Sequence, residues 1–370
     1  MLLSIQYLRG AAAILVLFVH MSPILDGVYT QQNIGYLLFG QFFFGVDLFF
    51  VISGFIICLS TEKNEHHGWL KYIIRRFFRL YPLMLICVAI CSIIAIKMNI
   101  TDYGEPNLHN VVKSILPLHI NYLSSPPFFG YNILAPVWTL SYEVMFYIYF
   151  LVAIVISHKY RVVAGITLIF TTMLMLQLVF SGSVSMNAYR TMNYPEGIER
   201  PFIALLSSPM MIDFIYGMFA YLIHKHVTLP VSGLIKVLLL FIFLASVCVL
   251  CSGGLIPSGS TAPPFKLLHG PNNWGIISFL MVATFVLYEK TFGIDKCEFM
   301  NMLGNISYSV YLTQFILFRL LFELHFFRKI SGFSKFFFTG LIIIFISYLT
   351  HLLIEKPFMA ISRRLISKMK

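Results

Sequence analysis

Residues 37–58 read LLFGQFFFGVDLFFVISGFIIC, a run of 22 positions in which Asp47 is the single charged residue. A helix that crosses the apolar core of a bilayer needs about 20 predominantly apolar residues, so this run has the length and composition of one membrane span. Comparable runs are centred near 5–25, 72–97, 134–157, 162–181, 209–224, 233–251, 274–289, 303–324 and 334–354. The pattern predicts an all-α polytopic integral membrane protein with about ten transmembrane helices.

The overall composition agrees with a chain that is solvated by lipid. Hydrophobic residues make up 59% of the 370 positions and charged residues 11%. A soluble globular domain carries about 25% charged residues. Three loops, near 98–133, 182–208 and 252–273, are longer than the other links between the runs. Since they leave no room for a second folding unit, we expect a single integral-membrane domain over residues 1–370.

The distribution of Lys and Arg predicts an orientation in the membrane. With the N-terminus in the cytoplasm, 17 of these residues fall on the cytoplasmic side and 8 outside. This is the positive-inside bias, and it predicts cytoplasmic N- and C-termini. The net charge of +11 then reflects topology and contact with anionic lipid headgroups. We therefore expect membrane lipids as partners and no nucleic acid. The sequence has no zinc-ligand pattern, so we expect no metal.

Ionisable residues inside the apolar runs are the candidates for function, because each is costly in hydrocarbon. Arg9 and His20 lie eleven residues apart, which returns a helix to within about 20° of the same face, about 16 Å further along the axis. An imidazole is a natural general base for a hydroxyl. The alternative interpretation is an interfacial Arg and a His that only packs against a neighbouring helix.

Three arginines, Arg75, Arg76 and Arg79, cluster at i,i+3 and i,i+4 spacing at the start of the run near 72–97. Guanidinium groups bind phosphate oxygens in a bidentate manner, so the cluster is a candidate phosphate site. Arginine-rich cytoplasmic flanks are also common topological signals, and that interpretation stays open here.

Two carboxylates lie in or near the apolar runs. Asp47 is expected to meet a cation or an imidazole from a neighbouring helix, because it is costly in lipid. Glu143 shares a helix face with Thr139 and Tyr147, and near a helix end it could also favour the positive dipole. Either carboxylate could orient His20 for catalysis, as Asp does in hydrolase triads, and the sequence does not choose between them.

Six segments of the chain resemble, in order, the acyltransferase 3 family of integral-membrane acyltransferases. They are Tyr7-Leu8-Arg9-Gly10 with His20, FGVDLFFVISGF at 44–55, RRFFRLYP at 75–82, WTLSYE at 138–143, GNISYSVYL at 304–312 and IEKP at 354–357. Any one segment is a weak signal. All six in order are specific, and together they extend over nearly the whole chain.

The resemblance implies O-acylation, most often O-acetylation, of bacterial surface glycans such as lipopolysaccharide O-antigen. The donor would be cytoplasmic acyl-coenzyme A (acetyl-CoA), and the acceptor would be a surface polysaccharide or its lipid-linked precursor. By analogy His20 is the catalytic base, and Arg9, Arg75, Arg76 and Arg79 are expected to bind the donor. Substrate binding is expected at Trp138, Tyr142, Tyr311 and Gln314.

This chain departs from the family pattern at Gln314, where the family often has His. Because Gln cannot act as a base, proton transfer is expected to rest on His20. The main alternative function is a transporter or flippase for a glycan or another polar substrate, since buried ionisable residues also mark translocation routes. A scaffold in glycan assembly is a third interpretation. Direct transfer and a covalent acyl-enzyme are both open.

Overall fold

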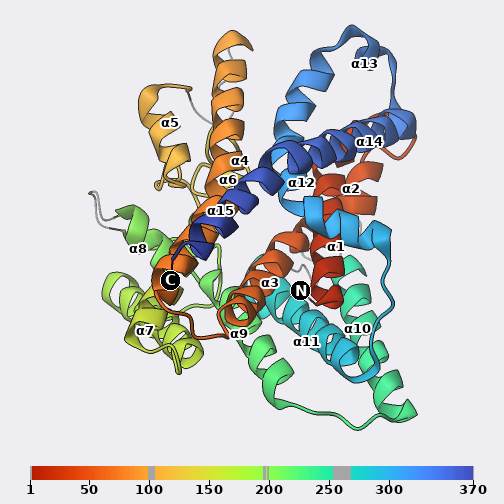
Figure 1. The fold of residues 1–370 in the computed structure, drawn as a ribbon. Helices are drawn as coiled ribbons and strands as arrows, with labels where there is room; N and C mark the ends of the chain where they lie inside the picture. Colours follow the sequence, from red (N-terminus) through yellow and green to blue (C-terminus); the bar gives the residue numbers. More distant parts are fainter. Residues whose placement is uncertain (1, 99–104, 195–196, 198–199, 253–267, 370) are drawn as a thin grey trace. The chain divides into compact units, whose positions relative to one another are not determined.

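The computed structural model describes residues 2–98, 105–194, 197, 200–252 and 268–369 (Figure 1). Most of the predicted loop at 252–273 therefore lies outside the described part of the chain. Throughout the described ranges, every regular element is helical. This confirms the predicted all-α architecture.

Eight of the described helices are long and apolar enough to cross a membrane, and nine if one bent pair forms a single span. The bent pair is α8 (Arg200–Leu206) and α9 (Met211–His226), which meet at 43°. The prediction was about ten. The difference includes the run at 303–324, which lies in α12 (Glu298–Glu323). This helix contains polar residues such as Ser307 and Gln314, which lower its mean hydropathy. Their side chains are buried against other helices.

The described chain divides into two compact units. Unit 1 contains Met1–Ile56 and Tyr216–Tyr348, and unit 2 contains Ile57–Ile215 and Leu349–Lys370. The elements of unit 1 are α1 (Leu3–Met21), α2 (Ile34–Phe39), most of α3 (Gly45–Ser60), most of α9, α10 (Gly233–Ser252), α11 (Ile276–Phe292), α12, α13 (His325–Lys329) and most of α14 (Gly332–Thr350).

Unit 2 is built around the long helix α4 (Gly68–Met98), which packs against α6 (Val137–Ile156) and α15 (Lys356–Ser367). The short helix α5 (Leu108–Ile115) also contacts α4, and α7 (Arg161–Ser181) packs against α6 and α8. These contacts bring segments from both halves of the sequence together within one unit.

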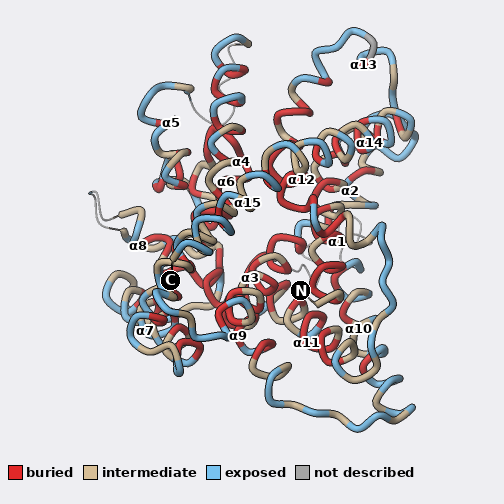
Figure 2. Tube along the Cα trace, in the orientation of Figure 1, coloured by how far each residue is buried: buried red, intermediate tan, exposed pale blue. Residues whose placement is uncertain are grey.

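The core of unit 1 depends on a close approach of α1 and α12, whose facing sides are buried in Figure 2. A Cβ atom on Gly10 would lie 2.8 Å from the backbone nitrogen of Gly304, and one on Gly304 would collide with the carbonyl oxygen of Gln6. Small residues at such positions let helix backbones touch in membrane proteins. The glycines of the first and fifth motifs therefore set the spacing of these two helices.

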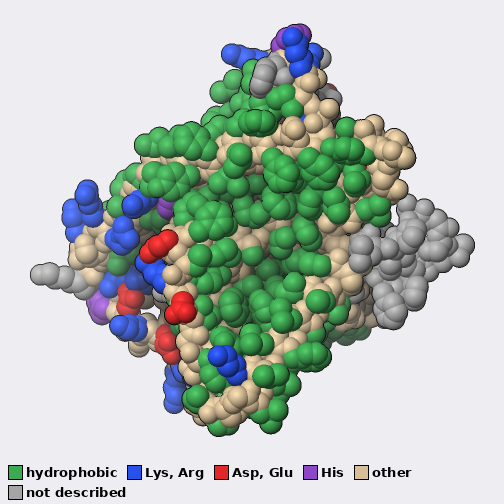
Figure 3. All heavy atoms as spheres, turned by 90° about the vertical axis from the view of Figure 1, so that its right-hand side faces the viewer, with side chains coloured by type: hydrophobic (Ala, Val, Ile, Leu, Met, Phe, Trp, Pro, Cys, Tyr) green, Lys and Arg blue, Asp and Glu red, His purple; other side chains and the backbone are tan. Residues whose placement is uncertain are grey.

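The lipid-facing character of the protein is visible in its exposed apolar side chains. On α14, Phe337, Leu341 and Phe345 follow one another at i,i+4 spacing, and each is more than 60% exposed. Figure 3 shows one face on which hydrophobic side chains form a broad continuous area. Apolar patches of this extent are rare on soluble monomers. Together with the long apolar helices they establish an integral membrane protein.

Candidate active site

Arg9 belongs to a polar cluster between α1 and α12 in unit 1. Its Nη2 donates to Ser307 Oγ at 3.0 Å, and its Nη1 lies 3.4 Å from Gln6 Oε1. Gln6 in turn donates from Nε2 to Asn305 Oδ1 at 2.7 Å. The first and fifth motifs of the sequence therefore meet here. Hydrogen bonds from both helices hold the Arg9 guanidinium in one orientation.

His20 lies on the same helix as Arg9, near its C-terminal end, and is partly buried. Its imidazole ring contacts Phe43 and Phe315, with ring centroids 5.6 and 4.7 Å apart. Both contacts are edge-on aromatic contacts, and in the described residues no hydrogen bond is made to its ring nitrogens. The ring is thus positioned by packing.

Asp47 is fully buried and pairs with a histidine that the sequence reasoning did not identify. Its Oδ2 lies 2.7 Å from Nδ1 of His269, and its Oδ1 accepts a hydrogen bond from the backbone N–H of Gly270 at 2.8 Å. His269 is also buried. It was missed because it lies in the loop predicted at 252–273, where no helical periodicity points to a partner. The expectation that Asp47 meets an imidazole is met by this residue.

Phe43 connects the two histidines of unit 1. Its ring contacts His20 on one hand and His269 on the other, the latter with centroids 6.5 Å apart. The ring of His269 also packs edge-on against Trp274, with centroids 4.8 Å apart. The structure therefore gathers His20 and the Asp47–His269 pair around one aromatic side chain.

The predicted substrate residues of α12, Tyr311 and Gln314, also lie in unit 1. The ring of Tyr311 packs against Phe49, with centroids 6.0 Å apart. Gln314 is fully buried and donates from Nε2 to the backbone oxygen of Tyr311 at 3.0 Å. Its Oε1 has no hydrogen-bond partner in the described part of the chain. An unsatisfied buried acceptor of this kind is costly, so Gln314 can accept a hydrogen bond from a substrate group.

Two of the three clustered arginines in unit 2 are neutralised by carboxylates. Nη2 of Arg75 lies 2.8 Å from both carboxylate oxygens of Glu65. Nη1 of Arg79 lies 2.9 Å from Oε2 of Glu355, which is almost completely buried. The second pair joins the third and sixth motifs of the sequence. It joins α4 to the π-helical segment His351–Glu355 that precedes α15.

Arg76 has a different environment from its two neighbours. Its guanidinium lies over the rings of Tyr72 and Tyr147, 5.5 and 5.2 Å from the ring centroids, and its Nη2 donates to Ser60 Oγ at 2.6 Å. No carboxylate in the described residues pairs with it, and its buried Nε has no partner there. Of the predicted donor-binding arginines, Arg76 is therefore the best suited to an incoming oxyanion.

Glu143 lies on α6 in unit 2, next to this arginine. Its carboxylate accepts a hydrogen bond from the hydroxyl of Tyr147, the residue whose ring Arg76 covers. The predicted shared face of Glu143 and Tyr147 is thus formed. Glu143 and Tyr147 therefore belong to the cluster around Arg76 in unit 2, while His20 belongs to unit 1.

Trp138 and Tyr142, which were predicted to bind substrate, are buried at the start of α6. The hydroxyl of Tyr142 donates to the backbone oxygen of Pro127 at 2.9 Å, and the ring of Trp138 packs against Phe128 with centroids 4.9 Å apart. Both side chains therefore pack against the segment 126–131 and support it. The partly exposed rings of that segment, rather than the two buried ones, are available to a ligand.

Comparison with known proteins gives the site its context. Residues 2–352 match the model of the Acyl_transf_3 family, described as an acyltransferase domain. The chain is 28% identical over 195 residues to an uncharacterized protein of Haemophilus influenzae, covering 49% of this chain and 75% of that protein. It is 24% identical over 274 residues to the exopolysaccharide production protein ExoZ of Rhizobium meliloti, covering 72% of this chain and 74% of that protein.

No solved structure matches the chain. The family match includes both clusters described above, the one around Arg9 and His20 on α1 and the one around Arg76 on α4, since it spans residues 2–352. With its long apolar helices, this chain is a membrane-embedded acyltransferase that belongs to the acyltransferase 3 family.

Proposed function

We propose that this protein transfers an acyl group, most simply acetyl, from cytoplasmic acyl-coenzyme A to a hydroxyl of a surface polysaccharide or its lipid-linked precursor, in the bacterial inner membrane. The observation that carries the proposal is the arrangement of α1, where Arg9 is tied to Ser307 and His20 has ring nitrogens without a protein partner in the described residues. A fixed cation and an available base on one helix fit a long anionic donor and a hydroxyl acceptor.

The chemistry at His20 is a direct acyl transfer. The imidazole takes the proton of the acceptor hydroxyl while the oxygen attacks the thioester carbonyl carbon. The carbon–sulfur bond breaks, and the leaving thiolate takes up the proton that the imidazolium gives back. A positioned base of this kind contributes about 10²–10⁴-fold to a rate. Because a thioester is already activated, a covalent detour through the imidazole gains little.

The donor phosphates are assigned to Arg76 rather than to its neighbours Arg75 and Arg79. Since Glu65 and Glu355 pair with those two neighbours, Arg76 is the arginine of the cluster that forms no salt bridge with a carboxylate in the described residues. Charge-assisted hydrogen bonds from a guanidinium to a phosphate are about twice as strong as neutral ones.

The acceptor is proposed to be a polysaccharide on two grounds. The relative from Rhizobium meliloti is named for exopolysaccharide production, and half-exposed aromatic rings at Phe128 and Tyr131 suit the apolar faces of sugar rings. The positive-inside distribution of charge supports an outer-side location for the loop that carries these rings. An acyl group would then cross the membrane barrier while coenzyme A stays in the cytoplasm.

The test is transfer by the purified protein in lipid nanodiscs. Radiolabelled acetyl-coenzyme A is supplied with an oligosaccharide acceptor, and the labelled ester is identified by mass spectrometry and by its release with mild base. We expect ester formation by the wild type and none by His20→Ala. Label on the saccharide that is not held in an ester bond would contradict the proposal. Uptake of the saccharide into sealed vesicles without acylation would also contradict it and would favour a transporter.

A further inference from the structure

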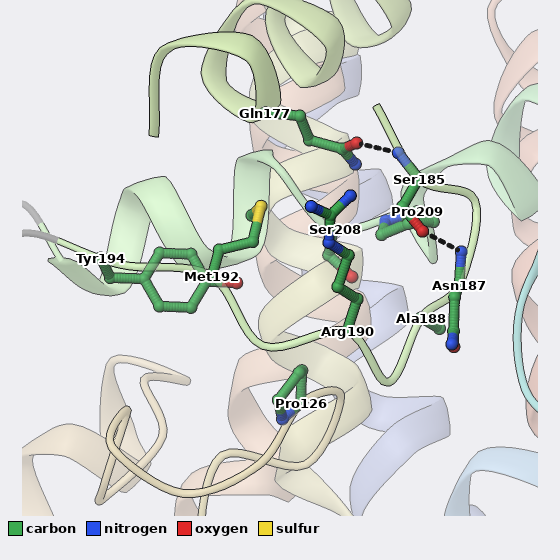
Figure 4. A pocket seen from close by; sticks show the side chains of 10 residues that line it. All are labelled: Pro126, Gln177, Ser185, Asn187, Ala188, Arg190, Met192, Tyr194, Ser208 and Pro209. Atoms are coloured by element: carbon green, nitrogen blue, oxygen red, sulfur yellow. Dashed lines mark hydrogen bonds between the residues drawn. The ribbon is translucent and has the colours of Figure 1, made fainter. Parts of the chain in front are cut away.

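A shallow, partly open hollow lies beside the segment 185–194 in unit 2 (Figure 4). It has no part in the assignments above. The residues that line it are Pro126, Gln177, Ser185, Asn187, Ala188, Arg190, Met192, Tyr194, Ser208 and Pro209. By the positive-inside distribution these residues face the outer side of the membrane, where an acceptor would approach.

The wall of the hollow is held in place by a chain of hydrogen bonds. Gln177 is almost completely buried, and its amide donates to the backbone oxygen of Ser207 at 2.9 Å and accepts from the backbone N–H of Ser185 at 2.8 Å. The side chains of Ser185 and Asn187 then accept from the backbone N–H groups of Asn187 and Tyr189. The loop is therefore preorganised without a ligand, which reduces the entropic cost of binding.

Arg190 projects from this loop with its charge uncompensated among the described residues. Its Nη2 donates to Ser181 Oγ and Ser183 Oγ, both at 2.7 Å, and its Nη1 donates to the backbone oxygen of Ser183 at 3.3 Å. All three acceptors are neutral. They fix the direction of the guanidinium but do not cancel its charge. A fixed, unpaired guanidinium at the wall of a hollow selects an oxyanion.

An aromatic shelf, which we define as Phe128, Tyr131 and Tyr189, adjoins the arginine. The rings of Phe128 and Tyr131 stack with centroids 5.2 Å apart, and Tyr189 contacts Phe128 at 6.2 Å. All three side chains are partly exposed. Tyr131 has a φ of 60° and Phe129 one of 45°. Such left-handed conformations cost about 1–3 kcal/mol each and cluster at ligand sites.

We propose that the hollow and the aromatic shelf form the acceptor subsite for an oxyanion-bearing saccharide, in which Arg190 binds the oxyanion and the shelf binds the sugar ring. This inference rests on the proposed function and narrows its acceptor. The oxyanion is the carboxylate of a uronic acid or the phosphate of a lipid-linked glycan, and the two share the same guanidinium chemistry.

The test measures binding without the acyl donor, so that it is independent of catalysis. Three probes are titrated into the protein in nanodiscs by calorimetry: a uronic-acid disaccharide, the same disaccharide with its carboxyl reduced to an alcohol, and the glycosyl phosphate of that neutral disaccharide. The variants are Arg190→Gln, Arg190→Lys and, as a matched control, Arg328→Gln. Arg328 is exposed, is assigned to the same side, and pairs with Glu323 at 2.8 Å.

We expect the wild type and Arg328→Gln to bind one or both anionic probes about tenfold more tightly than the neutral one. Arg190→Gln should lose that preference and Arg190→Lys should keep part of it. Tight binding of the uronate alone, or of the phosphate alone, identifies the source of the oxyanion. Equal affinity for all three probes in the wild type, or an undiminished preference in Arg190→Gln, would overturn the subsite. Failure of the separate ester-formation assay would instead count against the acyltransferase assignment.

Discussion

Asp47 and His269 form a buried carboxylate–imidazole pair in unit 1, with Oδ2 and Nδ1 2.7 Å apart. The second carboxylate oxygen is satisfied by the backbone N–H of Gly270. Gly270 has a φ of 114°, in the region that favours glycine, so the chain turns sharply at this point. Both oxygens of Asp47 are therefore bound by two consecutive residues of one loop. The pair anchors the segment before α11 to the first turn of α3.

This arrangement predicts strong coupling between Asp47 and His269. Removing one partner of a buried pair leaves the other unsatisfied, which costs about 3–5 kcal/mol. Asp47→Asn and His269→Gln should each destabilise the protein, and the double variant should be more stable than the sum of the two losses predicts. A double-mutant cycle by chemical unfolding in detergent micelles measures this coupling. Simple additivity of the two losses would show that the pair contributes nothing as a unit.

The second prediction concerns the role of His20. Because the imidazole is assigned to the proton of the acceptor, His20→Ala should abolish transfer while donor affinity stays near that of the wild type. His20→Gln should behave in the same way, since an amide cannot take up a proton. Calorimetric titration with acetyl-coenzyme A and an ester assay separate the two properties.

Direct transfer through His20 has its own test. The wild type is mixed with radiolabelled acyl donor in the absence of acceptor and quenched on the millisecond scale. We expect no protein-bound label. Stoichiometric label on His20 would replace the direct mechanism with a ping-pong one that proceeds through an acyl-imidazole.

The sequence predicted the all-α architecture and the long apolar helices well, because both follow from composition and local periodicity. It could not predict that Asp47 would pair with His269, since the partner comes from a loop and is chosen by tertiary packing. Spacing alone made Arg75, Arg76 and Arg79 equivalent. Only the fold shows that Glu65 and Glu355 neutralise two of them. The number of spans also depends on the fold. The polar residues of α12 lower its mean hydropathy, and only the structure shows that they are buried.

The third prediction separates Arg76 from its neighbours. Arg76→Gln should weaken acetyl-coenzyme A binding about tenfold or more, since a hydrogen bond to a charged group contributes about 1.5–3 kcal/mol. Arg76→Lys should restore only part of the affinity, because an ammonium lacks the planar fork and packs less well on the rings of Tyr72 and Tyr147. Donor affinity is measured by calorimetry in nanodiscs.

The matched control for Arg76 is the double variant Arg75→Gln with Glu65→Gln. It removes the guanidinium of Arg75, the residue before Arg76 on α4, together with the carboxylate of Glu65 that pairs with it. The net charge of the cluster is therefore unchanged. We expect its donor affinity to stay within about twofold of the wild type. If this control loses as much affinity as Arg76→Gln, the structural integrity of the helix, and not the uncompensated guanidinium, determines donor binding.

The last prediction concerns His119, which lies outside the membrane spans. It packs against the segment 126–131, which carries two residues of the aromatic shelf. It is fully buried among the rings of Tyr122, Phe129 and Tyr142, and its Nδ1 lies 3.1 Å from the hydroxyl of Tyr122. Burial lowers the pKa of His119 from 6.5 to about 3. The folded protein therefore keeps this imidazole neutral at pH values at which the unfolded chain takes up a proton.

The sign of the pH effect follows from this difference in pKa. Above pH 6.5 the imidazole is neutral in both states and does not affect the pH dependence of stability. Between pH 6.5 and about 3 the unfolded state binds a proton that the folded state does not, so stability falls by about 1.4 kcal/mol for each pH unit. His119→Asn cannot take up this proton, so between pH 7.5 and pH 5 its free energy of unfolding should fall by about 2 kcal/mol less than that of the wild type. Chemical unfolding in micelles from pH 7.5 to 4.5 measures both slopes, and because all other titrating groups are common to the two proteins, parallel slopes would show that His119 is protonated equally in both states.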